Sequence, residues 1–139
     1  INFDGMTVLE PPLDPALDAL IERRYHATMD ERLPAGDSRT GRHLFVALPR
    51  HGLSILAAGA SDWAVFPKDG AYIGDEAYFL AHMLHFMQSS LAGDPALDPA
   101  LLRQWIAARA LQIEQARLVL IAHQFDFLAR RRNQPPFQG

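Results

Sequence analysis

The stretch "RLVLIAHQFDFLARR", Arg117 to Arg131, decides the fold expected for this chain. Its residues Leu118 to Ile121 are all apolar, without the alternation of a half-exposed strand, and ring-bearing side chains follow at His123, Phe125 and Phe127. A continuous apolar run of this kind is typical of a strand that is covered on both faces and flanked by neighbours. We therefore expect the last strand, over Leu118–Phe127, to lie in the middle of a sheet.

Two earlier segments are expected to form the flanking strands. The first is Ile1–Leu9, which ends at Pro11 and Pro12 because proline has no N–H to donate to a neighbouring strand. The second is Leu53–Phe66, where the small residues in the centre predict a bend or bulge near Gly59.

Four helices are expected between these strands. Asp14-Pro15 and Asp98-Pro99 each combine an N-cap with proline at the first helical position, and apolar residues follow at helical spacing. Asp37 or Ser38 can cap another helix, which should end near Pro49. In "DEAYFLAHMLHFMQSSL" the apolar residues wrap much of the helix, so we expect it to be largely buried. The expected order is strand, helix, helix, strand, helix, helix, strand.

The composition fits one domain over residues 1–139, because 49% hydrophobic and 21% charged residues suffice for a single core. The net charge of -3 gives no overall attraction to nucleic acid or to an acidic membrane. We expect the basic run Arg130 to Arg132 to be a solvated tail. The absence of cysteine excludes disulfides, a thiolate nucleophile and cysteine-ligated zinc.

The longest uninterrupted apolar run, Leu118–Ala122, is far too short to span a membrane. Nothing at the start resembles a signal peptide. These features predict a soluble, cytoplasmic protein without a membrane partner. The chain starts at Ile1, inside an expected strand, so we expect it to be cut from something longer.

The segment "GDSRTGRHLF", Gly36 to Phe45, has two interpretations. It is either a capped surface loop before a helix or a site for an anionic group. The second interpretation comes from Arg39 and Arg42, whose guanidinium groups stand beside the free N–H groups of a helix N-terminus.

Several strings, taken in order and at their spacing, resemble the C-terminal part of class I S-adenosylmethionine-dependent methyltransferases. They are "INFDG", "GDSRTGRHLF", "SDWAVFP", "DEAYFL" and "IAHQFDFL", and the resemblance runs from Ile1 to about Arg131. In that family the first half carries the glycine-rich loop that holds the cofactor. Neither G-x-G-x-x-G nor a P-loop occurs in these 139 residues.

The resemblance implies an α/β fold, a fragment of a Rossmann-like methyltransferase fold with about three strands and four helices. Its strand order would be first, third, second, with the third antiparallel. The inserted helices would roof the pocket of a small-molecule acceptor. Substrate-binding residues implied or suggested near that roof are Ser38, Arg39, Arg42, His43, Trp63, Tyr72, Tyr78 and His82. S-adenosylmethionine would be the cofactor of the intact parent, and none is expected for this fragment, which should be inactive alone.

The histidines raise two further hypotheses. His82 and His85 are three residues apart on one helix, so they share a face, and Asp75, Glu76 or His123 would have to complete a metal site. Because the pair lacks the glutamate of a zincin motif, we assign no metal ligand. A base for methyl transfer would have to be His26, His82, His85 or His123, and the sequence selects none of them. A hydrogen-bonded core position is the simpler interpretation of His123.

Three classes of function remain open at this point. The first is the C-terminal, substrate-side part of a methyltransferase. The alternative is a non-catalytic ligand-binding or dimerisation module, because the edge of strand Ile1–Leu9 would be unpaired and an open edge favours pairing with a second chain. A metal-assisted hydrolase using His82 and His85 is a third.

Overall fold

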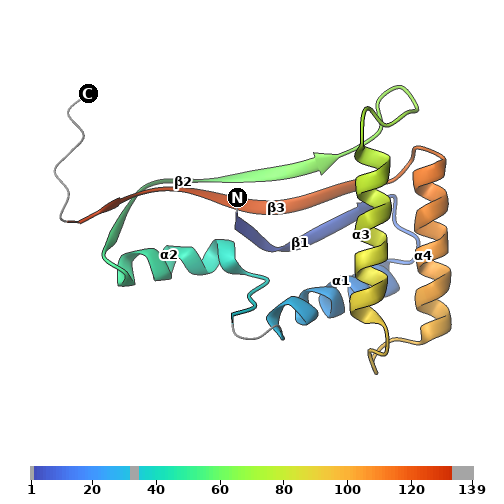
Figure 1. The fold of residues 1–139 in the computed structure, drawn as a ribbon, viewed down its shortest axis with the longest axis horizontal. Helices are drawn as coiled ribbons and strands as arrows, with labels where there is room; N and C mark the ends of the chain where they lie inside the picture. Colours follow the sequence, from blue (N-terminus) through green and yellow to red (C-terminus); the bar gives the residue numbers. More distant parts are fainter. Residues whose placement is uncertain (1, 32–34, 133–139) are drawn as a thin grey trace.

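The protein is described by a computed structural model over residues 2–31 and 35–132. Its elements in chain order are β1 (Asn2–Glu10), α1 (Pro15–Asp30), α2 (Thr40–Arg50), β2 (Leu53–Val65), α3 (Glu76–Leu91), α4 (Pro99–Glu114) and β3 (Val119–Arg131) (Figure 1). The expected order of strands and helices is therefore confirmed. Ile1, expected to start the first strand, lies outside the described residues.

The three strands form one sheet in the order β1-β3-β2, and β3 is antiparallel to both neighbours. The prediction that the last strand lies in the middle is confirmed. Because β1 and β2 both oppose β3, they run parallel to each other. Their carboxyl ends meet at the same end of the sheet, where Glu10 pairs with Val119 and Val65 pairs with Leu120.

Helices pack against both faces of the sheet, at different positions along the strands. Phe125 and Phe127 of β3 contact Phe45 of α2 at ring separations of 5.5 and 4.7 Å. Side chains alternate along a strand, so Leu120 points to the other face, where it packs with Leu80 of α3. Helix α2 therefore lies on one face, and α3 lies on the other, across the carboxyl ends of β1 and β2 (Figure 1).

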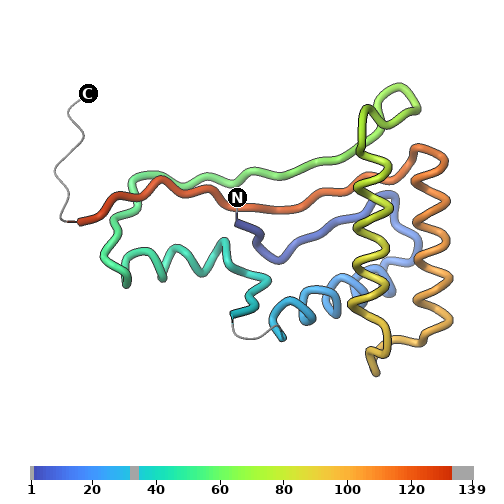
Figure 2. Tube along the Cα trace, viewed as in Figure 1, coloured from blue at the N-terminus to red at the C-terminus, as the bar shows by residue number. Residues whose placement is uncertain are grey.

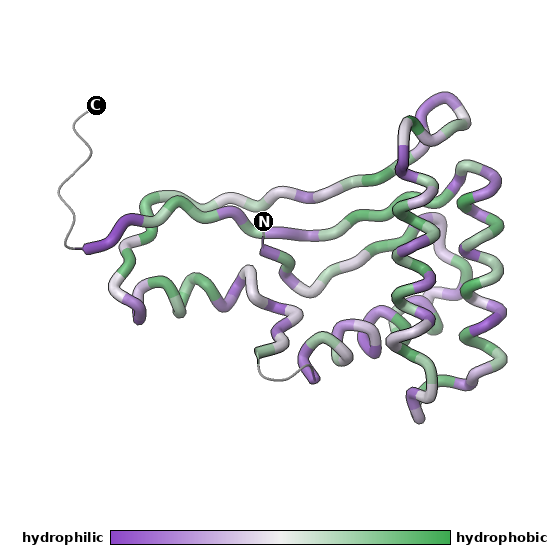
Figure 3. Tube along the Cα trace, in the orientation of Figure 1, coloured by the Kyte–Doolittle hydropathy of each residue, from purple (hydrophilic) through white to green (hydrophobic). Residues whose placement is uncertain are grey.

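The core lies where α1, α3 and α4 meet this end of the sheet. Its larger part contains Ile21, Tyr25, Leu84, Met87, Leu91, Leu97, Leu102 and Trp105, and a smaller part contains Val65, Leu80, Leu118 and Leu120. Figure 3 shows β3 hydrophobic beside α3 and hydrophilic near its middle. The expectation that α3 is largely buried is wrong, because its buried residues form one stripe and Tyr78 on its outer side is 74% exposed.

Local sequence signals fix the helix starts. Asp14 accepts hydrogen bonds from the N–H groups of Ala16 and Leu17, and Asp98 does the same for Ala100 and Leu101. Both cap-and-proline predictions are confirmed. These caps satisfy N–H groups that lack a partner within the helix.

Two details differ from the sequence expectation. The register shift in β2 lies between Ile55 and Ala57, whereas Gly59 is in regular pairing with Asp126. The basic run is not simply a tail, because Arg130 and Arg131 pair with β2. Extended backbone continues there because β2 begins directly after the α2 turn and supplies a partner strand. The ribbon of β2 and β3 therefore extends past β1, alongside α2 (Figure 2).

Candidate functional site

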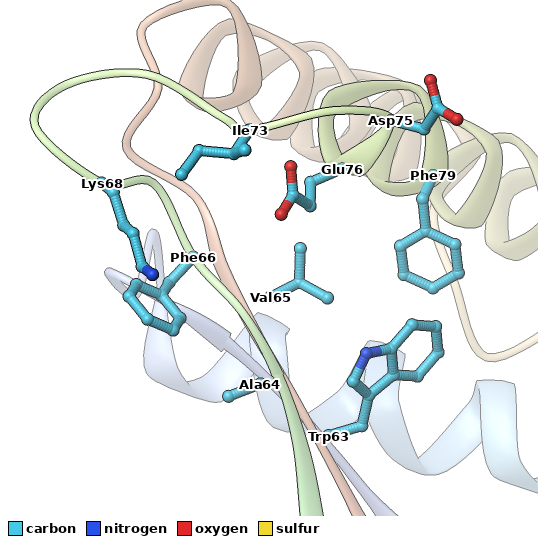
Figure 4. Close-up of a pocket in the computed structure, with 9 residues that line it drawn as sticks. All are labelled: Trp63, Ala64, Val65, Phe66, Lys68, Ile73, Asp75, Glu76 and Phe79. Carbon is cyan, nitrogen blue, oxygen red and sulfur yellow. The ribbon is translucent and has the colours of Figure 1, made fainter.

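A pocket of about 540 Å³ lies at the carboxyl end of β2, and we call it the β2-end pocket. It is lined by Trp63, Ala64, Val65, Phe66, Lys68, Ile73, Asp75, Glu76 and Phe79 (Figure 4). In open α/β sheets ligands bind outside the carboxyl ends of the strands. The volume also falls in the usual range for small-molecule sites, about 300–1,000 Å³.

Aromatic side chains form much of its wall. The ring centroids of Trp63 and Phe79 are 4.6 Å apart with an interplanar angle of 45°. Trp63 is 49% exposed and Phe66 is 47% exposed, so about half of each aromatic residue faces the pocket or solvent. Isolated exposed apolar residues are common, but a group around a hollow is typical of a binding site.

Glu76 places a carboxylate against this apolar wall. It is the first residue of α3, and its Oε2 atom is buried without a hydrogen-bond partner. In Figure 4 the Glu76 carboxylate lies between Ile73 and Phe79, whereas the Asp75 carboxylate points away from the pocket. A buried acceptor without a donor costs about 1–3 kcal/mol, so the Glu76 oxygen is suited to a ligand that donates.

The loop that carries Lys68 is held by a small turn. Lys68 and Ala71 exchange two backbone hydrogen bonds of 2.8 and 3.0 Å, and Gly70 adopts φ +79° between them. Next to the turn, the Tyr72 hydroxyl donates to the carbonyl oxygen of Leu118 at 2.7 Å. Burial raises the pKa of the Tyr72 hydroxyl above its usual 10.0. Tyr72 therefore ties the loop to the start of β3.

A second cavity, of about 250 Å³, lies at the carboxyl end of β1. Arg109 of α4 lines it with no exposed surface. Its guanidinium donates to Asp18 at 2.7 Å, to the Pro11 carbonyl oxygen at 2.7 Å and to Gln112 at 2.9 Å. Because these bonds are internal, Arg109 joins α4 to α1 and to the loop after β1.

The Asp18 carboxylate is the hub of this cluster. Its Oδ1 atom accepts from Trp105 Nε1 at 2.5 Å and from Arg109 Nη2 at 2.7 Å. Burial alone would raise the pKa of Asp18, but the hydrogen bonds from Trp105 and Arg109 outweigh it and hold the pKa below the usual 3.8. The carboxylate stays charged, as expected for a structural ion pair.

The segment Gly36 to Phe45 lies away from both cavities, near the amino end of β1. Its anionic partner is the carboxylate of Asp4, which accepts from the Arg42 backbone N–H at 2.7 Å and from Nη2 at 2.8 Å. Burial alone would raise the pKa of Asp4, but the hydrogen bonds from Arg42 outweigh burial and hold this pKa below the usual 3.8. The helix N-terminus and Arg42 therefore hold a group of the protein itself.

The neighbouring side chains are also engaged internally. The Ser38 N–H donates to Asp30 at 2.6 Å, the Arg39 N–H donates to Asp37 at 2.9 Å, and His43 pairs with Asp37 at 2.8 Å. Ser38 is 2% exposed. The prediction that Asp37 or Ser38 caps this helix is wrong: Arg39 is the N-cap residue, and a helix N–H, that of Arg42, is accepted by Asp4 of β1 instead.

The eight sequence-predicted substrate residues thus fall into separate groups. Trp63 lines the β2-end pocket and Tyr72 lies beside it. Tyr78 and His82 stack on α3 with centroids 6.3 Å apart. The remaining four, Ser38, Arg39, Arg42 and His43, lie toward the amino end of β1.

Sequence reasoning missed Phe66, Lys68 and Ile73 as pocket residues and considered Glu76 only as a possible metal ligand. One signal was available: Pro67 and Asp69-Gly70 mark a loop directly after a strand, where ligand sites gather.

The histidines do not gather into a metal site. In residues 2–31 and 35–132, no three His, Asp or Glu side chains are placed to hold an ion. His123 is not in the core, since its ring is partly exposed and pairs with Asp62 at 2.7 Å. His26 is buried and lies 3.1 Å from the Thr7 hydroxyl. Its burial lowers its pKa below 6.5.

Comparison with known proteins finds no matching family model, no matching curated protein and no matching solved structure. Within the described ranges, no helix has the length and apolar character needed to cross a membrane. The functional argument therefore depends on the strand order and on the residues around the two cavities.

Proposed function

We propose that this chain is the substrate-side part of an S-adenosylmethionine-dependent methyltransferase that acts on a small-molecule acceptor. The observation that carries the proposal is the position of β3, antiparallel between two strands that run parallel to each other. That arrangement is the one implied by the resemblance of "INFDG", "SDWAVFP" and "IAHQFDFL" to the end of the methyltransferase sheet.

The acceptor, on this proposal, lies at the carboxyl ends of β1 and β2. Helices α1, α3 and α4 pack there, and the β2-end pocket opens beside α3. Trp63 would contact the acceptor directly, and Tyr72 would position the pocket loop through its hydrogen bond to Leu118.

The residues present do not fit the methyl donor. The turn after β1 begins with Pro11 and Pro12, whose nitrogens have no hydrogen to donate to a carboxylate or a ribose. The Leu13 N–H is bonded to Asp18, and the N–H groups of Ala16 and Leu17 are bonded to Asp14. We therefore assign donor binding to residues outside these 139.

The reading frame upstream of Ile1 tests the proposal. We expect a strand, a glycine-rich loop and, about twenty residues further on, an acid that binds a ribose. An open frame without that pattern would overturn the methyltransferase assignment. Calorimetry with S-adenosylmethionine adds a second test: we expect no heat of binding with the 139-residue chain and clear binding with the extended chain. Tight binding to the 139 residues would overturn the assignment of donor binding to other residues.

A second candidate is a dimerisation module, and one observation favours it. Strand β1 is at the border of the described sheet, so the backbone groups on its outer side have no strand partner there. Part of this edge is covered, because the Thr7 N–H donates to Glu22 of α1 at 2.9 Å.

A further inference from the structure

We propose that the β2-end pocket binds a small aromatic amine in its protonated form, with the ammonium group on Glu76 and the ring against Trp63 and Phe79. The inference rests on the proposed function only for the role of this molecule as the acceptor. The binding itself requires no methyl donor, so it can be tested separately.

The buried Oε2 atom of Glu76, which has no hydrogen-bond partner, indicates which polar group the ligand carries. Oε2 is buried without a partner, and no ion pair joins Glu76 to Lys68, although both belong to the described residues. A cationic donor both neutralises a carboxylate and satisfies its lone pairs, and such bonds are roughly twice as strong as neutral ones. An ammonium group therefore suits Glu76 better than a hydroxyl group does.

The aromatic side chains of the pocket wall indicate that the rest of the ligand is a planar ring. Trp63 forms a tilted pair with Phe79 and remains 49% exposed, and Val65 lies between the strand and α3 in the pocket wall (Figure 4). Planar rings pack on such faces, and a cation near them gains a further attraction of about 0.5–2 kcal/mol.

Lys68 limits where the ammonium can lie. Its side chain runs toward Phe66 on the opposite side of the pocket from Phe79 (Figure 4). Two cations repel, so the ligand amine is directed to the Glu76 side and away from Lys68. An aromatic acid would have the reverse preference, which makes it the informative negative probe.

The experiment compares three probes of similar shape: 2-phenylethylamine, 2-phenylethanol and 3-phenylpropanoate. Each is titrated into the 139-residue chain, and binding is followed by NMR shifts of the backbone amides from Phe66 to Phe79. We expect the amine to bind about tenfold more tightly than the alcohol, because its hydrogen bond to Glu76 is charge-assisted and that of the alcohol is not. The acid should bind more weakly than the alcohol.

Three variants locate the effect. Glu76→Gln should reduce the amine-to-alcohol ratio to about one, whereas Glu114→Gln, at an exposed glutamate outside the pocket lining, should preserve it. Trp63→Leu should weaken amine and alcohol together, because it removes the ring and not the charge. Circular dichroism and a thermal melt confirm that each variant is folded.

Equal binding of amine and alcohol to the wild-type chain would overturn the inference, as would a ratio unchanged by Glu76→Gln. Shifts confined to residues outside the pocket would also overturn it. These outcomes leave the methyltransferase proposal standing, because that proposal depends on the upstream sequence and on donor binding by the extended chain.

Discussion

The carboxylate of Asp4, near the start of β1, caps α2 through Arg42: Oδ1 accepts the Arg42 backbone N–H at 2.7 Å, and Oδ2 lies 2.8 Å from Nη2. The Asp4 side chain is only 4% exposed, whereas Arg42 is half exposed. The pair joins two segments 38 residues apart.

Replacing Arg42 should therefore destabilise the fold. We expect Arg42→Met to lower the free energy of unfolding by about 2 kcal/mol, because it leaves a buried carboxylate with fewer donors. The exposed pair of Asp37 and His43 is the control, and His43→Gln should change stability by less than about 0.5 kcal/mol. Urea denaturation measures both. Equal effects would show that the Asp4 contact contributes no more than a surface pair.

Gly41 allows α2 to approach the sheet closely. A Cβ atom there would lie 2.9 Å from the Asn2 carbonyl oxygen and 3.1 Å from a Phe125 ring carbon. Gly41→Ala should cost about 1–3 kcal/mol, since the backbone of β1 cannot yield as a flexible side chain does. Gly59, with no atom within 4 Å of its Cβ position, is the matched control. Gly59→Ala should be neutral or stabilising by up to about 1 kcal/mol.

The buried hydrogen bonds of Arg109 predict that removing its charge strongly destabilises the folded protein. Arg109→Met should lower the free energy of unfolding by about 3 kcal/mol, because Asp18, Gln112 and the Pro11 carbonyl oxygen lose a donor. Arg103 is exposed on the same helix, so Arg103→Met should change stability by less than about 0.5 kcal/mol. If thermal melts show similar shifts for the two variants, the cluster does not stabilise the contact of α4 with α1.

His26 predicts how stability depends on pH. Burial lowers its pKa in the folded protein, while Glu22 and Asp30 oppose the shift and Arg39 adds to it. Below about pH 6.5 the unfolded chain therefore binds more protons at His26 than the folded protein does. The contribution of His26 to the free energy of unfolding is complete above about pH 6.5 and decreases as the pH falls toward the folded pKa. His26→Gln should flatten the decrease between about pH 7.5 and 5.5. Urea midpoints across this interval test it, and parallel wild-type and variant curves would contradict it.

The border position of β1 predicts weak self-association. Sedimentation velocity at low and high concentration should show a dimer forming through β1. Met6→Lys should weaken the dimer, because a lysine on an edge strand opposes pairing. Leu56→Lys, on the strand at the other border, should leave it intact. A monomer at all concentrations, or equal sensitivity to both lysines, would count against the β1 interface.

The elements of this fold could be predicted because their signals are local. The apolar run at Leu118–Ile121 and the caps at Asp14 and Asp98 depend on neighbours in the sequence, and the structure confirms them. The central position of the last strand followed from its apolar run, whereas its antiparallel direction came from the family resemblance.

The candidate site could not be predicted in the same way. The partner of Arg42 is Asp4, on a different strand, so no spacing within Gly36 to Phe45 reveals that the guanidinium is occupied. The pocket role of Glu76 likewise depends on Trp63, which approaches only after β2 and α3 fold together. Contacts between distant segments determine which polar groups stay available, and the sequence pattern does not contain them.

The parallel arrangement of β1 and β2 also has an evolutionary consequence. The connections that leave their carboxyl ends bring α1 and α3 to the cavities, while α2 packs against the ribbon beyond Gln124 through Phe45. New ligand preferences can therefore arise by lengthening or remodelling those two connections, and the hydrogen-bonded register of the ribbon need not change.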